Sequence, residues 1–259
     1  LPLKNAKLDT LQIFWQTCLM TEKFALVTGG SRNIGASICK RLCQDGINVI
    51  SVDIIEPDHQ YLTAHYETDL SNSSHSRETF NTINKKYDIK YLINNVGLVS
   101  PTALEEETLN NFNKVIQTNT SSALLAFQSV FPTMKRLEFG RVVSISSRVH
   151  LGKPLRTSYS ASKGALLSLT RTWALELGKY GITFNCVAPG PIATSEFWKN
   201  NPKNAPLTKS IIENIPLQKI GTPEDVAHAV SYFLDDRSSF VTGQTMYVCG
   251  GVTVGLSHN

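Results

Sequence analysis

The chain has 259 residues, of which 41% are hydrophobic and 18% charged, and its formal net charge at pH 7 is +4. This composition is typical of a globular protein that is long enough to bury a substantial core. The basic residues are scattered and form no run of five, so we expect no binding to nucleic acid and none to a membrane.

The five cysteines include no Cys-x-x-Cys pair, and their odd number favours free thiols in a reducing compartment. We therefore expect a cytoplasmic location. The six histidines show no metal-binding spacing, so we expect no metal site. Residues 11–20 are apolar, but glutamines dilute them and the run is too short to span a bilayer. We expect residues 1–20 to be an extension outside the core fold and residues 21–259 to form the domain.

A strand is predicted over residues 23–28, and the glycine-rich turn Thr28-Gly-Gly-Ser-Arg-Asn-Ile-Gly35 follows it directly. Apolar residues at helical spacing come next, which predicts a strand, a turn and a helix. Glycines in such a turn let the backbone approach a pyrophosphate, whose charge is stabilised by the N–H groups of the helix start. This arrangement indicates a dinucleotide site.

A second strand, residues 47–53, ends at Asp53. A carboxylate at this position can accept both ribose hydroxyls of NAD and would repel a 2′-phosphate. The alternative is an aspartate that only caps the loop. A third strand over 63–68 and a polar helix over 72–86 follow, and a fourth strand over 91–94 runs into Asn94-Asn95-Val96-Gly97.

Residues 108–137 show a long helical pattern with Asn119 in the middle. Asparagine is unfavourable inside a helix, so Asn119 marks either a local distortion with a polar role or an exposed surface position.

A fifth strand, residues 141–145, leads to Ser147, and a helix is predicted from Tyr159 to about residue 177. Tyr159 and Lys163 are four residues apart, so they lie on one face of this helix. An ammonium close to a phenol favours the phenolate and would lower the pKa of Tyr159, which suits acid–base chemistry. Taken alone, such a pair more often lies on a solvated helix face.

The last third of the chain predicts a strand over 182–188, an irregular lid over 195–218, a helix that begins at Thr222 and a final strand over 244–248. Strands and helices alternate throughout. The sequence therefore predicts an α/β fold, a single doubly wound Rossmann-type domain with a mostly parallel sheet flanked by helices.

In their order along the chain, these segments resemble the short-chain dehydrogenase/reductase family from Lys23 to about Val252, and specifically its 3-oxoacyl-reductase-like members. The matching motifs are Gly29 to Gly35, Asp69-Leu70, Asn94 to Gly97, Asn119, Ser147, Tyr159-x-x-x-Lys163, Pro189-Gly190 with Thr194, and Thr242-Gly243-Gln244.

The resemblance implies a catalytic tetrad of Asn119, Ser147, Tyr159 and Lys163. Tyr159 would exchange the proton and Ser147 would orient the substrate oxygen. Lys163 would bind the nicotinamide ribose, and Asn119 would hold a water that links Lys163 to solvent. The residues expected to hold the cofactor are Gly29, Ser31, Arg32, Asn33, Ile34, Gly35, Asp53, Asp69, Leu70, Asn95, Gly97, Tyr159, Lys163, Pro189, Gly190, Ile192 and Thr194.

Three positions depart from the family pattern. Asn33 replaces a glycine of the turn, and asparagine is the residue besides glycine that best tolerates a positive φ. Val96 stands where alanine is usual, and Cys249 stands where an aspartate is common.

Arg32 and Asp53 favour different cofactors, because Arg32 could pair with a 2′-phosphate that Asp53 would repel. A like charge facing a phosphate in a partly buried site costs more than one exposed arginine returns. We therefore expect NAD rather than NADP.

The predicted substrate is a secondary alcohol or ketone, hydrophobic or cyclic. Its expected contacts are Ser147, Val149, His150, Tyr159, Phe197 and Trp198, with Val99, Leu151 and Pro191 as further pocket walls, and a surface role is the alternative for His150. A second hypothesis is reduction of 3-oxoacyl groups on a carrier protein, which would need a basic patch such as Lys135, Arg136, Arg148 and Arg156. A third is a non-catalytic nucleotide-binding regulator. The apolar residues Leu166, Leu169, Trp173 and Leu177 suggest a homo-oligomer, a dimer or tetramer, through the Tyr159 helix.

Overall fold

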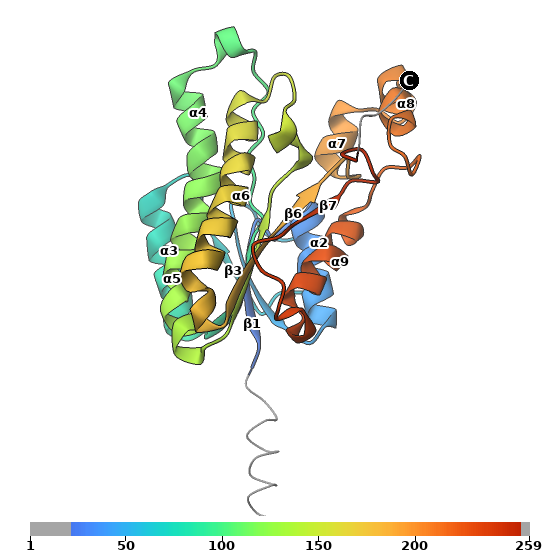
Figure 1. Ribbon diagram of the computed structural model, residues 1–259. Helices are drawn as coiled ribbons and strands as arrows, with labels where there is room; N and C mark the ends of the chain where they lie inside the picture. Colours follow the sequence, from blue (N-terminus) through green and yellow to red (C-terminus); the bar gives the residue numbers. More distant parts are fainter. Residues whose placement is uncertain (1–21, 255–259) are drawn as a thin grey trace, which may run out of the picture.

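The computed structural model describes residues 22–254, and the expected extension over residues 1–20 lies outside this range. Seven strands form one sheet in the order β3-β2-β1-β4-β5-β6-β7, and every strand pair is parallel (Figure 1). The strands are β1 (Phe24–Thr28), β2 (Asn48–Asp53), β3 (Ala64–Glu67), β4 (Ile89–Asn94), β5 (Gly140–Ile145), β6 (Ile182–Pro189) and β7 (Thr245–Val248).

The strand order reverses between β1 and β4. Thr28, the last residue of β1, pairs with Val52 of β2 on one side and with Asn94 of β4 on the other. Because all strands are parallel, their carboxyl ends meet at one edge of the sheet, which faces upward in Figure 1. Ligands of doubly wound sheets bind at such a reversal.

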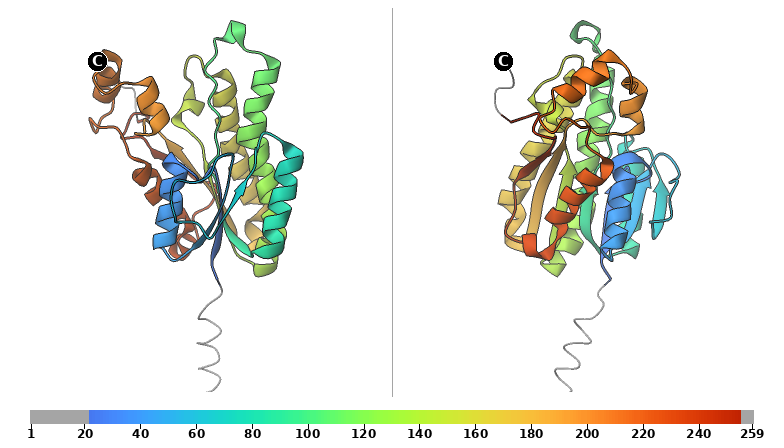
Figure 2. Two further views of the ribbon diagram at one scale, coloured as in Figure 1. Left: turned by 180° about the vertical axis from the view of Figure 1, so that it is seen from behind. Right: turned by 90° about the vertical axis from the view of Figure 1, so that its right-hand side faces the viewer.

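Helices cover both faces of the sheet, as the side and rear views show (Figure 2). One face carries α2 (Asn33–Gln44) and α9 (Pro223–Leu234), which pack against each other. The other face carries α3 (Ser73–Lys86), α5 (Ser122–Leu137) and α6 (Thr157–Leu177). Each layer buries its own set of apolar side chains against the sheet, so the core lies in two slabs.

The helix predicted over residues 108–137 is interrupted. It consists of α4 (Leu109–Ile116), a π-helical turn (Gln117–Ser121) and α5. Asn119 lies in that turn and is 2% exposed, so of the alternatives left open the structure shows the local distortion, and the exposed surface position is wrong. Such π turns occur often at functional sites.

The lid predicted as irregular contains two short helices, α7 (Ser195–Asn200) and α8 (Pro206–Glu213). The side chain of Thr194 caps α7 by accepting the N–H of Phe197 at 3.1 Å, and Pro206 is the first residue of α8. The prolines of this segment predict irregular chain, yet proline is favourable in the first helical turn. The start of α9 was predicted correctly, with Thr222 and Asp225 forming a capping box.

The apolar residues of α6 that suggested an oligomer interface belong to the core. Leu166 is 1% and Trp173 is 7% exposed, and Leu169 and Leu177 pack against the same cluster as Trp173. Leu166 and Trp173 are buried, and Leu169 and Leu177 partly buried, because α6 packs against both β6 and α4. These four residues therefore give no support to assembly.

Candidate active site

The glycine-rich turn joins β1 to α2 at the sheet reversal. Gly29 has a φ of +69°, and a Cβ on Gly35 would collide with the carbonyl oxygen of Gly29. The start of α2 carries no side-chain cap and no acidic residue in its first turn. No side-chain cap therefore occupies the first N–H groups of this helix, and a helix start of this kind fits the pyrophosphate of a dinucleotide.

Asn95 fastens the end of β4 to this turn. Its side-chain nitrogen donates to the carbonyl oxygens of Thr28 at 3.1 Å and Gly29 at 2.8 Å. Two residues further on, a Cβ on Gly97 would lie 3.2 Å from Lys163 Nζ. The structure thus gives Asn95 a structural role, and it explains why a residue without a side chain stands at position 97.

Asp53 caps the loop that it was expected to occupy. Its two carboxylate oxygens accept the N–H of Ser31 at 3.0 Å and the N–H of Ile54 at 2.7 Å. The side chain remains partly exposed at the carboxyl end of β2. Capping and ribose binding are compatible, because a carboxylate offers about four acceptor sites.

Asp69 and Leu70 follow β3. Leu70 is buried, and Asp69 is exposed and accepts the N–H of Ser71 at 2.8 Å. Asp69 also borders a hollow of about 320 Å³ beside Ile54. Three further acidic or imidazole side chains line that hollow, namely Glu67, His75 and Glu78. This end of the site therefore carries negative charge.

Ser147 follows β5 and begins the short helical turn Arg148–Leu151, where its hydroxyl accepts the N–H of Val149 at 3.3 Å. Ser147 also lies against the phenol of Tyr159, which rises from the first turn of α6. Burial raises the pKa of Tyr159, while the Ser147 hydroxyl and Arg156 act in the opposite direction. The prediction that Lys163 lowers this pKa is therefore not met, because desolvation dominates.

Lys163 is only 2% exposed, and its Nζ lies 5.8 Å from the centre of the Tyr159 ring. The amino group donates to the carbonyl oxygens of Ile145 at 2.9 Å and Val96 at 3.5 Å. Burial lowers the pKa of Lys163 to about 8, and Cys186 acts against that shift. The two side chains predicted to share one ligand do lie on one face at the same edge of the sheet.

Asn119 makes three hydrogen bonds from the π turn. Its Oδ1 accepts the N–H of Leu98 at 2.6 Å, and its Nδ2 donates to the carbonyl of Leu98 at 3.0 Å and to Ser162 Oγ at 2.9 Å. It thereby ties the loop after β4 to α6, next to Lys163. The water link to Lys163 stays a prediction.

The far wall of the site follows β6. Pro189 ends that strand, and a Cβ on Gly190 would lie 2.7 Å from the Cα of Cys249, which is buried there. Ile192 is buried and pairs with Gly221. Thr194 then caps α7, which carries the half-buried rings of Phe197 and Trp198 in edge contact.

His150 has a partner that the sequence did not suggest. Its Nε2 lies 2.8 Å from the hydroxyl of Tyr247 on β7, and burial lowers the pKa of its imidazole, with Arg171 acting in the same direction. This contact gives the half-buried His150 a structural partner rather than the free surface position that was the alternative, and its substrate contact stays a prediction. Tyr247 and His150 are 97 residues apart in the sequence, so only the fold identifies them as neighbours.

The four basic residues considered for carrier docking do not form one patch. Lys135 and Arg136 end α5, at the amino edge of the sheet, where Arg136 pairs with Asp88 at 2.6 Å. Arg148 and Arg156 lie at the carboxyl edge, and Arg156 acts on Tyr159. Together with Lys153, whose pKa is lowered by burial and by Arg156 and Arg148, they make the rim positively charged.

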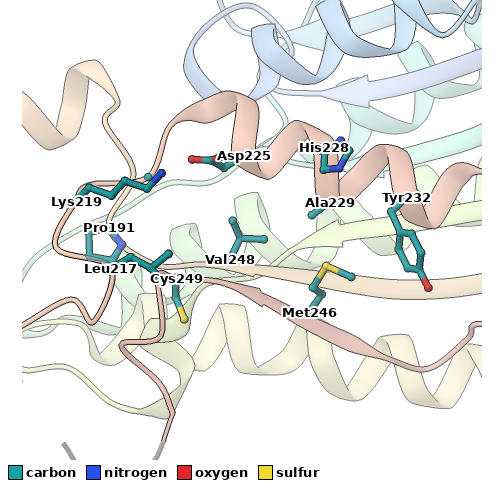
Figure 3. Close-up of a pocket in the computed structure, with 12 residues that line it drawn as sticks. Pro191, Leu217, Lys219, Asp225, His228, Ala229, Tyr232, Met246, Val248 and Cys249 are labelled. Carbon is teal, nitrogen blue, oxygen red and sulfur yellow. The ribbon is translucent and has the colours of Figure 1, made fainter.

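A separate hollow of about 450 Å³ lies between α9 and β7 (Figure 3). Its walls include Asp225, His228 and Tyr232 of α9 and Met246 and Val248 of β7. No residue of the predicted tetrad borders it.

Residues 22–254 contain neither a metal-binding cluster nor a helix that could cross a membrane. No group of three or more His, Cys, Asp or Glu side chains in this range is arranged to hold a metal ion. Nor does this range contain a helix with the length and apolar character that crossing a membrane requires.

The assembled groups can perform proton transfer to or from an oxygen held by Ser147. Tyr159 supplies the O–H. Lys163 supplies a buried amine, and its pKa of about 8 lets it change its protonation state near neutral pH. Next to them the turn and the start of α2 fit a dinucleotide.

Comparisons with known proteins agree with this geometry. A family model described as enoyl-(acyl carrier protein) reductase matches residues 29–253. The chain is 36% identical over 240 residues to a 3-oxoacyl-[acyl-carrier-protein] reductase of Buchnera aphidicola, covering 89% of this chain and 97% of the relative. It is 33% identical over 242 residues to a (2S)-[(R)-hydroxy(phenyl)methyl]succinyl-CoA dehydrogenase subunit of Thauera aromatica, covering 88% and 96%.

Solved structures show the same fold. The aldohexose dehydrogenase of Thermoplasma acidophilum superimposes with a TM-score of 0.85 at 28% identity, covering 92% of this chain and 96% of that one. A putative gluconate 5-dehydrogenase of Beutenbergia cavernae with bound NADP gives 0.84 at 26% identity, covering 90% and 97%.

Proposed function

From the premise that the chain belongs to the short-chain dehydrogenase/reductase family, we propose that its substrate is a 3-oxoacyl thioester. The chain is an NAD(P)-dependent oxidoreductase that acts on CH–OH groups. The proposal rests on the tetrad, whose four residues lie at one edge of the sheet. It is supported by the two relatives described above, which are 36% and 33% identical to this chain. The names of the two relatives described above both specify an acyl thioester, one on a carrier protein and one on coenzyme A.

Ser147 and Tyr159 would act together on the carbonyl oxygen at carbon 3. The Ser147 hydroxyl orients this oxygen, and the Tyr159 phenol donates its proton to it as the carbon is reduced. The raised pKa of Tyr159, caused by burial, keeps the phenol protonated at neutral pH, as a proton donor requires. The dinucleotide, when bound, supplies the hydride.

Lys163 and Asn119 would support this step. The amino group of Lys163 would hold the nicotinamide ribose, and Asn119 would fix the neighbouring loop at Leu98, whose N–H it accepts. Both side chains are buried and hydrogen-bonded, so they hold their positions before a substrate arrives.

We propose NAD(H) as the cofactor. Asp53 lies at the tip of β2 with two N–H partners, and Glu67 and Asp69 stand nearby at the same end of the site. A 2′-phosphate placed there would face these carboxylates. Arg32 is exposed and makes no ion pair with another described residue, so it is the one feature that favours NADP. The bound NADP of the Beutenbergia cavernae structure makes this a direct question for experiment.

A second candidate substrate is a hydrophobic or cyclic secondary alcohol or ketone. It is favoured by the paired rings of Phe197 and Trp198 on α7, which offer an apolar wall. The positive rim formed by Arg148, Lys153 and Arg156 favours the thioester, because carrier-bound and coenzyme A-bound acyl groups bring phosphate charges.

The test compares kcat/KM for a 3-oxoacyl-coenzyme A, the same acyl group on a carrier protein, and a panel of cyclic ketones, each with NADH and NADPH. We expect the thioesters to exceed every ketone by at least about ten-fold, which corresponds to about 1.4 kcal/mol in transition-state binding. A ketone that reacts faster than both thioesters would overturn the substrate assignment. A clear preference for NADPH would overturn the role given to Asp53.

A further inference from the structure

The glycine-rich turn and the start of α7 are joined directly by the side chains of Asn33 and Ser195. The Asn33 amide nitrogen donates to the Ser195 hydroxyl at 3.0 Å. The Asn33 amide oxygen accepts the N–H of Ser195 at 3.0 Å and its hydroxyl at 3.1 Å. Both ends of one amide therefore hold one residue of α7.

The backbone of Asn33 aims this amide. Asn33 is the first residue of α2 and has a φ of +52°, a left-handed conformation that asparagine tolerates better than other side-chain-bearing residues. A glycine, which the family pattern has at this position, would adopt the same backbone but could not reach Ser195.

The segment that contains α7 and α8 is otherwise held at its ends. Ala193 donates its N–H to Gly221 at 2.8 Å, and Gly221 donates to Pro191 at 3.1 Å. Among residues 22–254, the bonds to Asn33 are the only hydrogen bonds that connect residues 195–213 to anything outside 191–221.

We infer that Asn33 is a positioning residue, which latches α7 to the cofactor-binding turn and thereby sets the affinity for the carbonyl substrate. The inference rests on the proposed function, because α7 carries Phe197 and Trp198 to the expected substrate pocket. The turn that would hold the pyrophosphate also holds the latch. A dinucleotide on this turn therefore restrains Asn33 and, through Ser195, α7.

The first test is Asn33→Gly, which keeps the backbone conformation and removes the amide. At saturating NADH we expect KM for the carbonyl substrate to rise about five-fold, the effect of losing a net hydrogen bond, and to change more than kcat does. Ser195→Ala removes only the hydroxyl, so its effect should be smaller. In the double variant the two effects should not add, because each change breaks the same contact.

The second test does not depend on the substrate. Lys199, Lys203 and Lys209 lie within the latched segment, so trypsin can report on its opening in the full chain saturated with NADH. We expect Asn33→Gly to be cut at these lysines about five-fold faster than the unchanged protein, because a lost hydrogen bond shifts the opening equilibrium by that factor. Cleavage after Lys85 on α3 serves as the control and should not change.

The two readouts separate the possible failures. Unchanged cleavage at the three lysines in both single variants overturns the latch. Faster cleavage with an unchanged KM overturns its role in substrate affinity. If no carbonyl compound is turned over, the proposed function fails, and the cleavage rates still decide whether the latch exists.

Discussion

The phenol of Tyr159 contacts Ser147 and has an O–H that can donate a proton. Tyr159→Phe keeps the ring and removes that O–H. We expect kcat to fall by at least about 100-fold, as is typical for the loss of a general acid, while the Kd for NADH stays within a few fold. Steady-state kinetics and NADH fluorescence measure the two quantities. A variant that keeps most of its turnover would show that another group handles the proton.

The buried amine of Lys163 gives the protein a specific pH dependence. Its pKa is lowered to about 8 by burial, from an ordinary value of 10.5. At a pH between these two pKa values, Lys163 binds more protons in the unfolded chain than in the folded protein. The free energy of unfolding therefore increases as the pH rises. Relative to Lys163→Met, we therefore expect the unchanged protein to become more stable between pH 7.5 and pH 9.5.

Urea unfolding of both proteins at the two pH values measures this difference. The matched control is Lys40→Met, which removes an exposed lysine from α2. Its stability difference from the unchanged protein should stay nearly constant over the same range. A difference for Lys163→Met that is equally constant would show that Lys163 keeps its ordinary pKa.

At the scale of elements, the π turn between α4 and α5 depends on Asn119. Its three hydrogen bonds satisfy both backbone groups of Leu98 and the hydroxyl of Ser162. Asn119→Ala removes this partner from the partly buried backbone groups of Leu98 and from the buried hydroxyl of Ser162. We expect the free energy of unfolding to fall by about 1–3 kcal/mol and kcat to fall with it.

Asn113→Ala is the control for this prediction, because Asn113 is an exposed residue of the neighbouring α4. It should change the free energy of unfolding by less than about 0.5 kcal/mol. Equal effects of the two substitutions in urea unfolding would contradict the role given to the π turn.

Most elements could be predicted because their signals are local. Each strand is a short apolar run with a turn at its end, and Thr222 and Pro223 mark the start of α9 directly. The π turn could only be raised as an alternative, because an asparagine inside a helical pattern is equally compatible with an exposed position. The two lid helices could not be predicted, because a proline such as Pro202 or Pro206 interrupts the helical pattern of apolar residues. From sequence alone, a proline that begins a helix looks the same as one that ends it.

The parts of the site that could not be predicted depend on contacts between distant segments. Nothing in the sequence around Asn33 points to Ser195, and nothing around His150 points to Tyr247. The raised pKa of Tyr159 was missed for a related reason. Spacing on a helix predicts that Lys163 is near, but it does not predict how much other protein excludes water from the phenol.

At the scale of the whole molecule, the homo-oligomer stays a prediction that needs a different surface from the one first proposed. The outer sides of α5 and α6 expose Leu124 (38%) and Leu175 (89%). We expect light scattering to give a mass above the 28.6 kDa of one chain, and Leu124→Glu with Leu175→Glu to lower it. A mass of one chain for the unchanged protein would remove the expectation.

The packing of α2 against α9 joins the first helix of the described fold to the last. During synthesis, the ribosome has to complete residues 223–234 before the apolar side of α2 gains its cover. The segment with the nucleotide-binding turn and α2 is therefore synthesised early, but its packing is completed only after α9 has been made. A nascent chain stalled before α9 would present that side to chaperones or to other unfinished chains.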